Sequence, residues 1–533
     1  MIEQSGKNLP VETARPLSQS LLWSLQRRFY ENEGVGAWGN GPVPYYITST
    51  PFIARAYARM VLGFLRDCAG EGRLDREKPV YLVELGAGSG RFSYHFRRRL
   101  DELLRRSHFR DLRVTLVMSD FAEATVKHWR GRPEFARWVA DGSLDFARFD
   151  VERDQELRLL ESGAVLTPGG GANPIVCIAN YVFDSVPQDA FRFEGGRTLE
   201  LLAELWAEDR PGVDGVRLED LRICFYPREV NPGHYGNADF DRLVEEYRGC
   251  LDEKSVLMPI VALGCIARLR ALCGGRVLLL AGDKGYGQAS ELPPEPAPRL
   301  ALHGSRSMMV NFDAIGRYAR AAGGVAWRPR ARAVGLHVGA FLFGIPPECA
   351  VETDLAYLEA VDSGGPDDFF SVQIAMEKHC DDMELDQILA YLRLSGWDSH
   401  IFRCCLPAIR RHLATARPEC REALGAAIAE VDLGFLPTGE QYDLAYDLGL
   451  LWLDMDQPAA AAEQFEKSLQ RHGLEAPTLI NLSSCLLRLS EPIAASNKAD
   501  LALIVDPGNA VGQQLRALLV RQAETRVERA CSV

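Results

Sequence analysis

The sequence predicts an α/β fold, in which a mostly parallel, seven-stranded sheet is covered by helices and followed by an all-helical C-terminal domain. From Pro79 to about Gly344, short β-rich runs alternate with helical segments, as in parallel sheets buried on both faces. Beyond Pro346 the strand signal stops, and Leu, Ala and Glu recur at helical spacing. The 533 residues suffice for two or three domains.

Residues 1–77 are predicted to form a helical cap or lid. Leu17 to Tyr30 is amphipathic, a Gly- and Pro-rich loop follows (GVGAWGNGPVP), and Pro51 to Asp67 again has helical spacing of apolar residues. The segment Trp38 to Pro51, rich in Gly and aromatic residues, is a candidate lid over a ligand site.

Residues 78–346 are predicted to form the α/β domain. Its strands are expected at PVYLVEL, VTLVMSD, LDFARFD, PIVCIAN and RVLLLAG, with a last pair near AVGLHVGAFLFG. Arg91 to Leu104 is the expected helix after the first strand.

The C-terminal part is predicted to be a helical linker region, residues 347–439, and a repeat-like helical domain, residues 440–533. Gly364-Gly365-Pro366 is a plausible hinge. Two segments, Glu440–Gly473 and Leu474–Gly508, look like copies of one two-helix unit. This unit resembles the tetratricopeptide repeat. Such repeats build concave surfaces, so we expect a protein substrate or partner here, with oligomerisation or simple packing as the alternative.

Composition narrows the classes of partner. The chain has 60 Lys and Arg against 73 Asp and Glu, and the net charge of −13 disfavours nucleic acid and anionic membranes. The 13 Cys include no C-x-x-C, and the ten His show no metal-like spacing, so we expect a reducing cytoplasm and no metal. The most apolar run, from Val256 to Ala267, is too short to span a membrane.

The strongest local motif is the glycine-rich turn in VYLVELGAGSGRF. A buried strand runs into Glu84 and then Gly86, Gly88 and Gly90 before a helix, which places free backbone N–H groups at a ligand. The spacing E-x-G-x-G-x-G differs from the dinucleotide pattern G-x-G-x-x-G and is typical of S-adenosylmethionine (SAM) methyltransferases. A hydrolase elbow G-x-S-x-G is excluded, because Ala87 and Arg91 stand where it needs glycine.

Two acidic residues at later strand ends extend this cofactor site. Asp120 ends the second strand, where a carboxylate could accept hydrogen bonds from ribose hydroxyls, or else cap the next helix. Asp150 ends the third strand and could accept from the adenine amino group, or else serve only a turn. We therefore expect Glu84, the three glycines, Asp120 and Asp150 to bind SAM.

Three further segments carry a family resemblance. YYITSTP (residues 45–51) precedes a helix, ANYVFDSVP (179–187) follows the fourth strand and GDKGYG (282–287) follows the fifth. With the glycine loop, these segments resemble the MidA-like methyltransferases, the family of the mitochondrial complex I assembly-factor protein-arginine methyltransferase. The resemblance covers about residues 28 to 344 and implies a class I, Rossmann-like methyltransferase fold.

The resemblance also implies roles for individual residues. Asn180 and Asp184 would position the methyl acceptor, with Asp184 taking its proton, and Asp283, Tyr286 and Tyr46 would contact the substrate. Asp184 could instead cap a turn.

Two positions depart from the family pattern. Tyr181 replaces a Glu, and Lys284 replaces a Tyr. A guanidinium substrate needs carboxylates, so the loss at 181 weighs against arginine as the acceptor.

Three functions remain open from the sequence. The first is methyl transfer from SAM to a protein side chain, with arginine as one candidate. The second is the same chemistry on a small molecule. The third is a methyltransferase-like scaffold with weak catalysis that acts through its repeats.

Overall fold

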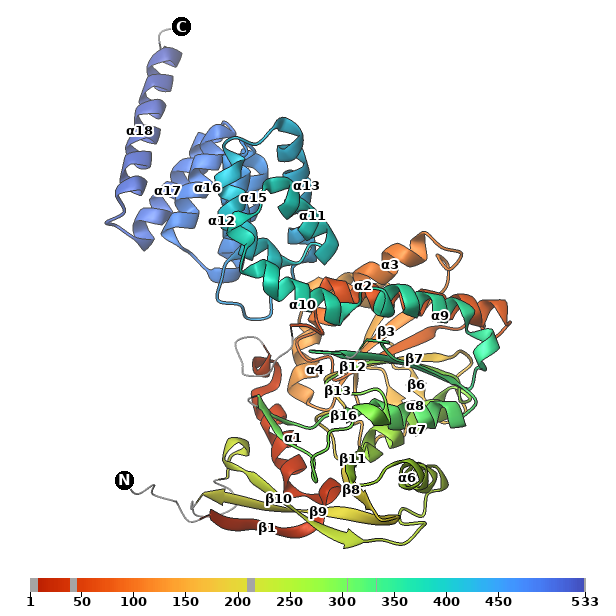
Figure 1. The fold of residues 1–533 in the computed structure, drawn as a ribbon. Helices are drawn as coiled ribbons and strands as arrows, with labels where there is room; N and C mark the ends of the chain where they lie inside the picture. Colours follow the sequence, from red (N-terminus) through yellow and green to blue (C-terminus); the bar gives the residue numbers. More distant parts are fainter. Residues whose placement is uncertain (1–7, 39–45, 209–215, 304, 332, 532–533) are drawn as a thin grey trace, which may run out of the picture. The chain divides into compact units, whose positions relative to one another are not determined.

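The computed structural model describes residues 8–38, 46–208, 216–303, 305–331 and 333–531 (Figure 1). The chain divides into two compact units, Met1–Gln373 and Ile374–Val533. Unit 1 contains the β-strands assigned in the described residues, and the described part of unit 2 is built from helices.

The centre of unit 1 is a seven-stranded sheet with the order β17-β18-β12-β7-β2-β3-β4. Strand β18 is antiparallel to its neighbours β12 and β17, whereas β12, β7, β2, β3 and β4 pair in parallel. This confirms the mostly parallel sheet predicted from the sequence. The strands are β2 (Val80–Leu85), β3 (Val114–Asp120), β4 (Leu144–Arg148), β7 (Ile175–Asn180), β12 (Val277–Asp283), β17 (Val325–Trp327) and β18 (His337–Phe343).

The strand order reverses direction beside β2. From β2 the chain proceeds outward through β3 and β4, whereas β7 and β12 lie on the other side. The loops that follow β2 and β7 therefore leave in opposite directions, which opens a crevice at the carboxyl ends of the strands. Ligands of open α/β sheets bind at such a point.

Helices cover both faces of this sheet. Figure 1 shows α2, α3 and α9 over one face and α7 and α8 over the other. Helix α2 begins where the sequence predicts, because Thr50 caps it by accepting from the Ile53 N–H (3.4 Å) and Pro51 occupies its first turn. The helices are α2 (Pro51–Gly70), α3 (Arg91–Arg105), α4 (Glu123–Arg130), α5 (Ala136–Ala140), α7 (Ile260–Leu272), α8 (Phe312–Ala321) and α9 (Val351–Tyr357).

Unit 1 also contains a five-stranded antiparallel sheet that the sequence analysis did not predict. Its order is β1-β9-β8-β11, and β10 also pairs with β9. Gly195 and Gly196, both at positive φ, form the tight turn between β8 and β9. Its strands are β1 (Asn8–Pro16), β8 (Asp189–Glu194), β9 (Arg197–Glu208), β10 (Arg222–Glu229) and β11 (Lys254–Met258), and α6 (Ala238–Cys250) precedes β11.

The prediction of a purely helical N-terminal cap is therefore wrong for residues 8–16. This segment has two prolines and no clear periodicity, and it becomes strand β1 because β9, distant in sequence, offers an edge to pair with. The predicted helix after it is confirmed as the short turn Leu17–Gln19 followed by α1 (Leu21–Glu33).

The boundary between the two units lies later than the predicted start of the helical region at residue 347. Helix α9 packs on α2, where the Asp67 carboxylate accepts from the N–H groups of Glu352 (2.9 Å) and Thr353 (2.8 Å). These bonds hold α9 in unit 1, and the boundary falls within α10 (Pro366–Glu377).

Unit 2 is a succession of helices. They are α11 (Leu385–Ser395), α12 (Ser399–Leu413), α13 (Pro418–Gly434), α14 (Leu444–Asp454), α15 (Pro458–His472), α16 (Ala476–Arg488), α17 (Pro492–Val505) and α18 (Ala510–Cys531). The pairs α14–α15 and α16–α17 occupy the two segments predicted to be copies of one unit. Gly449 permits close approach within the first pair, because a Cβ there would lie 2.6 Å from the Phe465 ring. The likeness to the tetratricopeptide repeat itself stays a prediction.

Candidate functional site

A cavity lies at the carboxyl ends of β2, β3, β4 and β7, where the strand order reverses. Counted together with the open solvent at its mouth, the empty space of the cavity is about 1450 Å³. Its walls include the loop after β2, the ends of β3 and β4, the segment after β7 and one face of α1.

The glycine loop forms one wall of the cavity through its backbone. Gly86 and Gly88 line the cavity at φ of 59° and 53°, a region that favours glycine. A Cβ on Gly86 would lie 3.1 Å from Val182, and a Cβ on Gly88 would lie 3.1 Å from the Trp38 ring. The loop therefore presents its backbone closely to the interior, as the sequence predicts.

Gly90 has a different role from the one predicted. It is the N-cap of α3 at φ 79° and is not among the residues that line the cavity. A Cβ there would lie 2.9 Å from the Met118 methyl group and 3.3 Å from the Phe135 ring. The absence of a side chain at Gly90 thus serves the packing of α3 against the sheet.

Glu84 is a buried acid at the floor of the cavity. It is the penultimate residue of β2, is 3% exposed and accepts a hydrogen bond from the Ser93 hydroxyl on α3. Burial raises the pKa of its carboxyl group from the ordinary 4.5 to about 8.

The pKa of Glu84 predicts a pH dependence of stability. The folded state binds the Glu84 proton more tightly than the unfolded state, so the contribution of Glu84 to the free energy of unfolding falls as pH rises from about 4.5 to about 8. Glu84→Gln removes this dependence. We expect the stability of the variant relative to the wild type to rise by about 2 kcal/mol between pH 6 and pH 8, measured by denaturant unfolding. Glu102→Gln, at a partly exposed carboxylate, is the control. An unchanged difference across this pH range for Glu84→Gln would contradict the prediction.

Asp120 lies in the cavity wall at the end of β3. One carboxylate oxygen accepts from the Ala122 N–H (2.8 Å), while Ala122 itself is the N-cap of α4. Burial raises the pKa of Asp120 to about 7. Asp120 therefore stabilises the turn before α4 and also faces the cavity, and the two roles that the sequence left open can coexist.

Asp150 also faces the cavity, but α1 contacts it in a way that the sequence did not reveal. Its Oδ2 forms an ion pair with Arg27 (2.8 Å), and its Oδ1 accepts from the Glu152 N–H (3.0 Å). Arg27 also lies over the Phe121 ring, 4.4 Å from its centroid. A ligand amino group at Asp150 would therefore share this carboxylate with Arg27.

The wall formed by α1 is the main part of the site that sequence analysis missed. The cavity is lined on this side by Trp23, Gln26, Arg27 and Tyr30. Trp38 stacks on Tyr30, with the ring centroids 5.8 Å apart. The amphipathic pattern of residues 17–30 signals a buried face, but not what that face covers. Of the predicted lid, Trp38, Thr48 and Ser49 line the cavity, and residues 39–45 lie outside the described residues.

Asn180 and Asp184, the predicted acceptor-binding pair, both line the cavity. The Asn180 side-chain oxygen accepts from the Tyr57 hydroxyl (2.8 Å), and its buried amide nitrogen has no hydrogen-bond partner among the described residues. Asp184 accepts from the Ser185 hydroxyl (2.7 Å), and burial raises the pKa of Asp184 to about 6. A buried donor without a partner is the kind of group that a bound ligand satisfies.

None of the three predicted substrate-binding residues, Asp283, Tyr286 and Tyr46, is among the residues that line the cavity. Asp283 is 1% exposed and lies behind Asp184, where it accepts from the Asp184 N–H (3.2 Å). Burial and the nearby Asp184 carboxylate raise the pKa of Asp283 well above its ordinary value. Tyr46, which accepts from the Gln373 amide (2.9 Å), and Tyr286 are not among the lining residues.

Tyr181 also belongs to the site, although in the sequence it was notable only because it replaces the Glu of the family pattern. It lines the cavity at φ 52°, which is unusual for a side chain of this size, and its N–H donates to the Gly282 carbonyl (2.9 Å). Strained backbone of this kind persists where the surrounding structure holds it, often at ligand sites.

Comparisons with known proteins give no family. No family model matches the chain, and no curated protein matches it.

Within the described residues, no helix is both long and apolar enough to cross a membrane.

Solved structures show distant similarity. An uncharacterised superfamily protein from Burkholderia thailandensis is 14% identical with a TM-score of 0.35, over 59% of this chain and 74% of that chain. A candidate methyl transferase from the same organism, bound to S-adenosyl-homocysteine, is 13% identical with a TM-score of 0.36, over 58% and 73%. Magnesium protoporphyrin IX methyltransferase from Synechocystis PCC 6803, with the same bound product, is 10% identical with a TM-score of 0.25, over 60% and 94%. TM-scores this low do not establish a function, which must be inferred from the residues of the site.

Proposed function

We propose that this chain is a SAM-dependent methyltransferase of the class I, Rossmann-like kind. The observation that carries the proposal is the arrangement of Glu84, Asp120 and Asp150 at the ends of three adjacent strands, around one cavity that the glycine loop also lines. The strand order reverses beside this cavity. Open α/β sheets bind nucleotide-like ligands at such a reversal.

The residues present fit the parts of SAM. The backbone of Gly86 and Gly88 would meet the amino-acid end, and Asp120 would accept from the ribose hydroxyls. The apolar wall near Phe149 would hold the adenine ring, with Asp150 at its amino group.

When bound, SAM supplies an electrophilic methyl group on a sulfonium. The task of the protein is to align the acceptor with that group and to exclude water. Asn180 would orient the acceptor through its free amide hydrogens. A carboxylate oxygen of Asp184 would accept the proton that the acceptor loses. With a pKa of about 6, Asp184 is ionised at neutral pH yet more basic than an ordinary aspartate.

The acceptor is proposed to be a protein side chain, with arginine as one candidate from the resemblance to the MidA-like methyltransferases. The Asp184 carboxylate in the cavity wall favours a cationic acceptor. The helices of unit 2 would recruit the substrate or a partner protein, and the cytoplasm is the proposed location. A small molecule is the second candidate, since the cavity also has room for one.

Calorimetric titration with S-adenosylhomocysteine tests the proposal. We expect micromolar binding with one site per chain, no comparable binding of NAD⁺, and transfer of a labelled methyl group from SAM to proteins of a cell extract. Trp23 and Trp38 line the cavity, so their fluorescence gives an independent readout. Failure of the wild type to bind would favour the scaffold function instead.

A further inference from the structure

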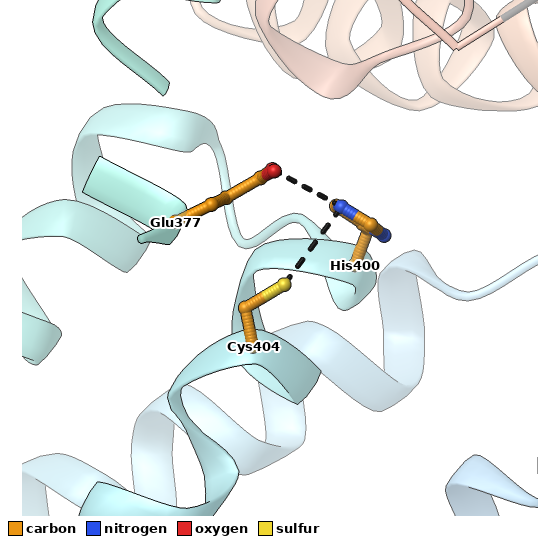
Figure 2. Close-up of side chains that lie close together, drawn as sticks. All are labelled: Glu377, His400 and Cys404. Carbon is orange, nitrogen blue, oxygen red and sulfur yellow. Dashed lines mark hydrogen bonds and ion pairs between the residues drawn. The ribbon is translucent and has the colours of Figure 1, made fainter. Parts of the chain in front are cut away.

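Three side chains of different chemistry converge in unit 2, at the start of α12 (Figure 2). Glu377 is the last residue of α10, and His400 and Cys404 lie one turn apart on α12. The His400 Nε2 atom is 3.1 Å from the Glu377 Oε1 atom and 3.8 Å from the Cys404 Sγ atom. The three ligand atoms all lie within 4.8 Å of one another.

These distances match those of a metal site. Zinc bonds of about 2.0–2.2 Å to nitrogen and oxygen and about 2.3 Å to sulfur, at tetrahedral angles, separate N from O by about 3.4 Å and N from S by about 3.6 Å. The observed 3.1 and 3.8 Å differ from these values by a few tenths of an ångström. Small side-chain rotations would therefore place the three atoms around one ion.

The placement of Glu377 and His400 on their helices is a second, independent observation. Glu377 is at the C-terminal end of α10 and His400 is in the first turn of α12. An acid at a helix C-terminus is disfavoured by the helix dipole, and a cation bound beside Glu377 would offset this effect. The first turn of α12 places the His400 imidazole next to that carboxylate.

We propose that Glu377, His400 and Cys404 form a zinc site that ties the end of α10 to the start of α12. A thiolate with an imidazole favours zinc over Mg²⁺ or Ca²⁺, which prefer oxygen ligands. Three protein ligands leave a fourth position for water or another ligand, and the His400 side chain, 41% exposed, gives the ion an entry path. The site is separate from the SAM cavity and does not depend on the proposed function.

A metal site was not predicted from the sequence, because these ligands show no motif spacing. Glu377 precedes His400 by 23 residues, and only the tertiary fold brings the end of α10 beside the start of α12. Burial and the Glu377 carboxylate raise the pKa of the Cys404 thiol to about 11, so an incoming ion must displace that proton.

Cobalt titration of the full, chelator-treated chain tests the site. Co²⁺ replaces zinc in tetrahedral sites and gives a thiolate-to-metal charge-transfer band in the near ultraviolet. We expect one equivalent to bind with this band and to be displaced by zinc. Cys404→Ser should lose the band, and His400→Gln and Glu377→Gln should each weaken binding by more than about 100-fold.

Matched variants control for the other thiols and imidazoles. Cys420→Ser, at a partly exposed cysteine of α13, and His379→Gln, at an exposed histidine, should leave the band and the affinity unchanged. X-ray absorption spectroscopy of the zinc-loaded wild type should show one sulfur atom bound to the ion. This measurement does not depend on the folding of any variant. Absence of stoichiometric binding by the wild type, or a band that survives in Cys404→Ser, would overturn the proposal.

Discussion

Gly88→Arg is expected to lower the affinity for S-adenosylhomocysteine by more than about 100-fold. Gly88 lines the cavity at φ 53°, and a Cβ there would lie 3.1 Å from the Trp38 ring. An arginine would have to adopt a disfavoured backbone conformation and would fill the space that the proposed cofactor needs. Isothermal titration of the wild type and the variant measures the loss.

A matched variant separates the loss of the site from general strain. Gly72 has a similar positive φ of 64°, and no other group lies within 4 Å of a Cβ built there. Gly72→Arg should therefore carry a comparable backbone strain and keep the wild-type affinity. If Gly88→Arg bound the ligand as tightly as Gly72→Arg, the glycine loop would not be the cofactor wall.

Asp184→Asn is expected to reduce methyl transfer by about 10²- to 10⁴-fold, the usual contribution of a positioned general base. An amide has nearly the shape of the carboxylate but cannot take a proton. Because Asp184 is proposed to contact the acceptor and not the cofactor, the affinity for S-adenosylhomocysteine should change by less than about 3-fold. Labelled-methyl transfer to extract proteins at saturating SAM measures the rate.

The pH dependence of the wild type gives a second test of Asp184. A proton acceptor must be ionised, and its pKa is raised to about 6, so transfer should rise as pH increases through about 6 and then level off. Asp313→Asn is the control for loss of a buried carboxylate. Asp313 accepts from the Tyr247 hydroxyl and pairs with Arg317, away from the cavity. Full transfer by Asp184→Asn would disprove the proton-acceptor role.

Much of the central fold could be predicted because it is encoded locally. Strands such as residues 80–85 and 175–180 are short apolar runs buried on both faces, which is a signal visible in any single stretch of sequence. The glycine loop, Asp120 and Asp150 could be assigned to one site because the carboxyl ends of adjacent parallel strands meet at one edge of a sheet. The helices of unit 2 could be predicted from the helical spacing of their apolar residues, whereas their likeness to a repeat stays a prediction.

The antiparallel sheet and the contribution of α1 could not be predicted. Strand β1 exists because β9, nearly 200 residues later, offers its edge. The ion pair of Arg27 with Asp150 joins residues that are 123 positions apart, and the sequence around either residue gives no signal that predicts the pairing. Pairing energies of this kind depend on which surfaces meet, and a local pattern does not contain that information.

Local patterns predict the alternation of strands and helices, the glycine turn and the acids at the strand ends, because these follow from periodicity and backbone stereochemistry over a few residues. Three further features emerge only in the folded chain: Gly90 packs a helix, Asp283 lies behind Asp184, and Glu377 meets His400 and Cys404. Close packing brings together side chains that are distant in sequence, and their burial and charge then set what each can do.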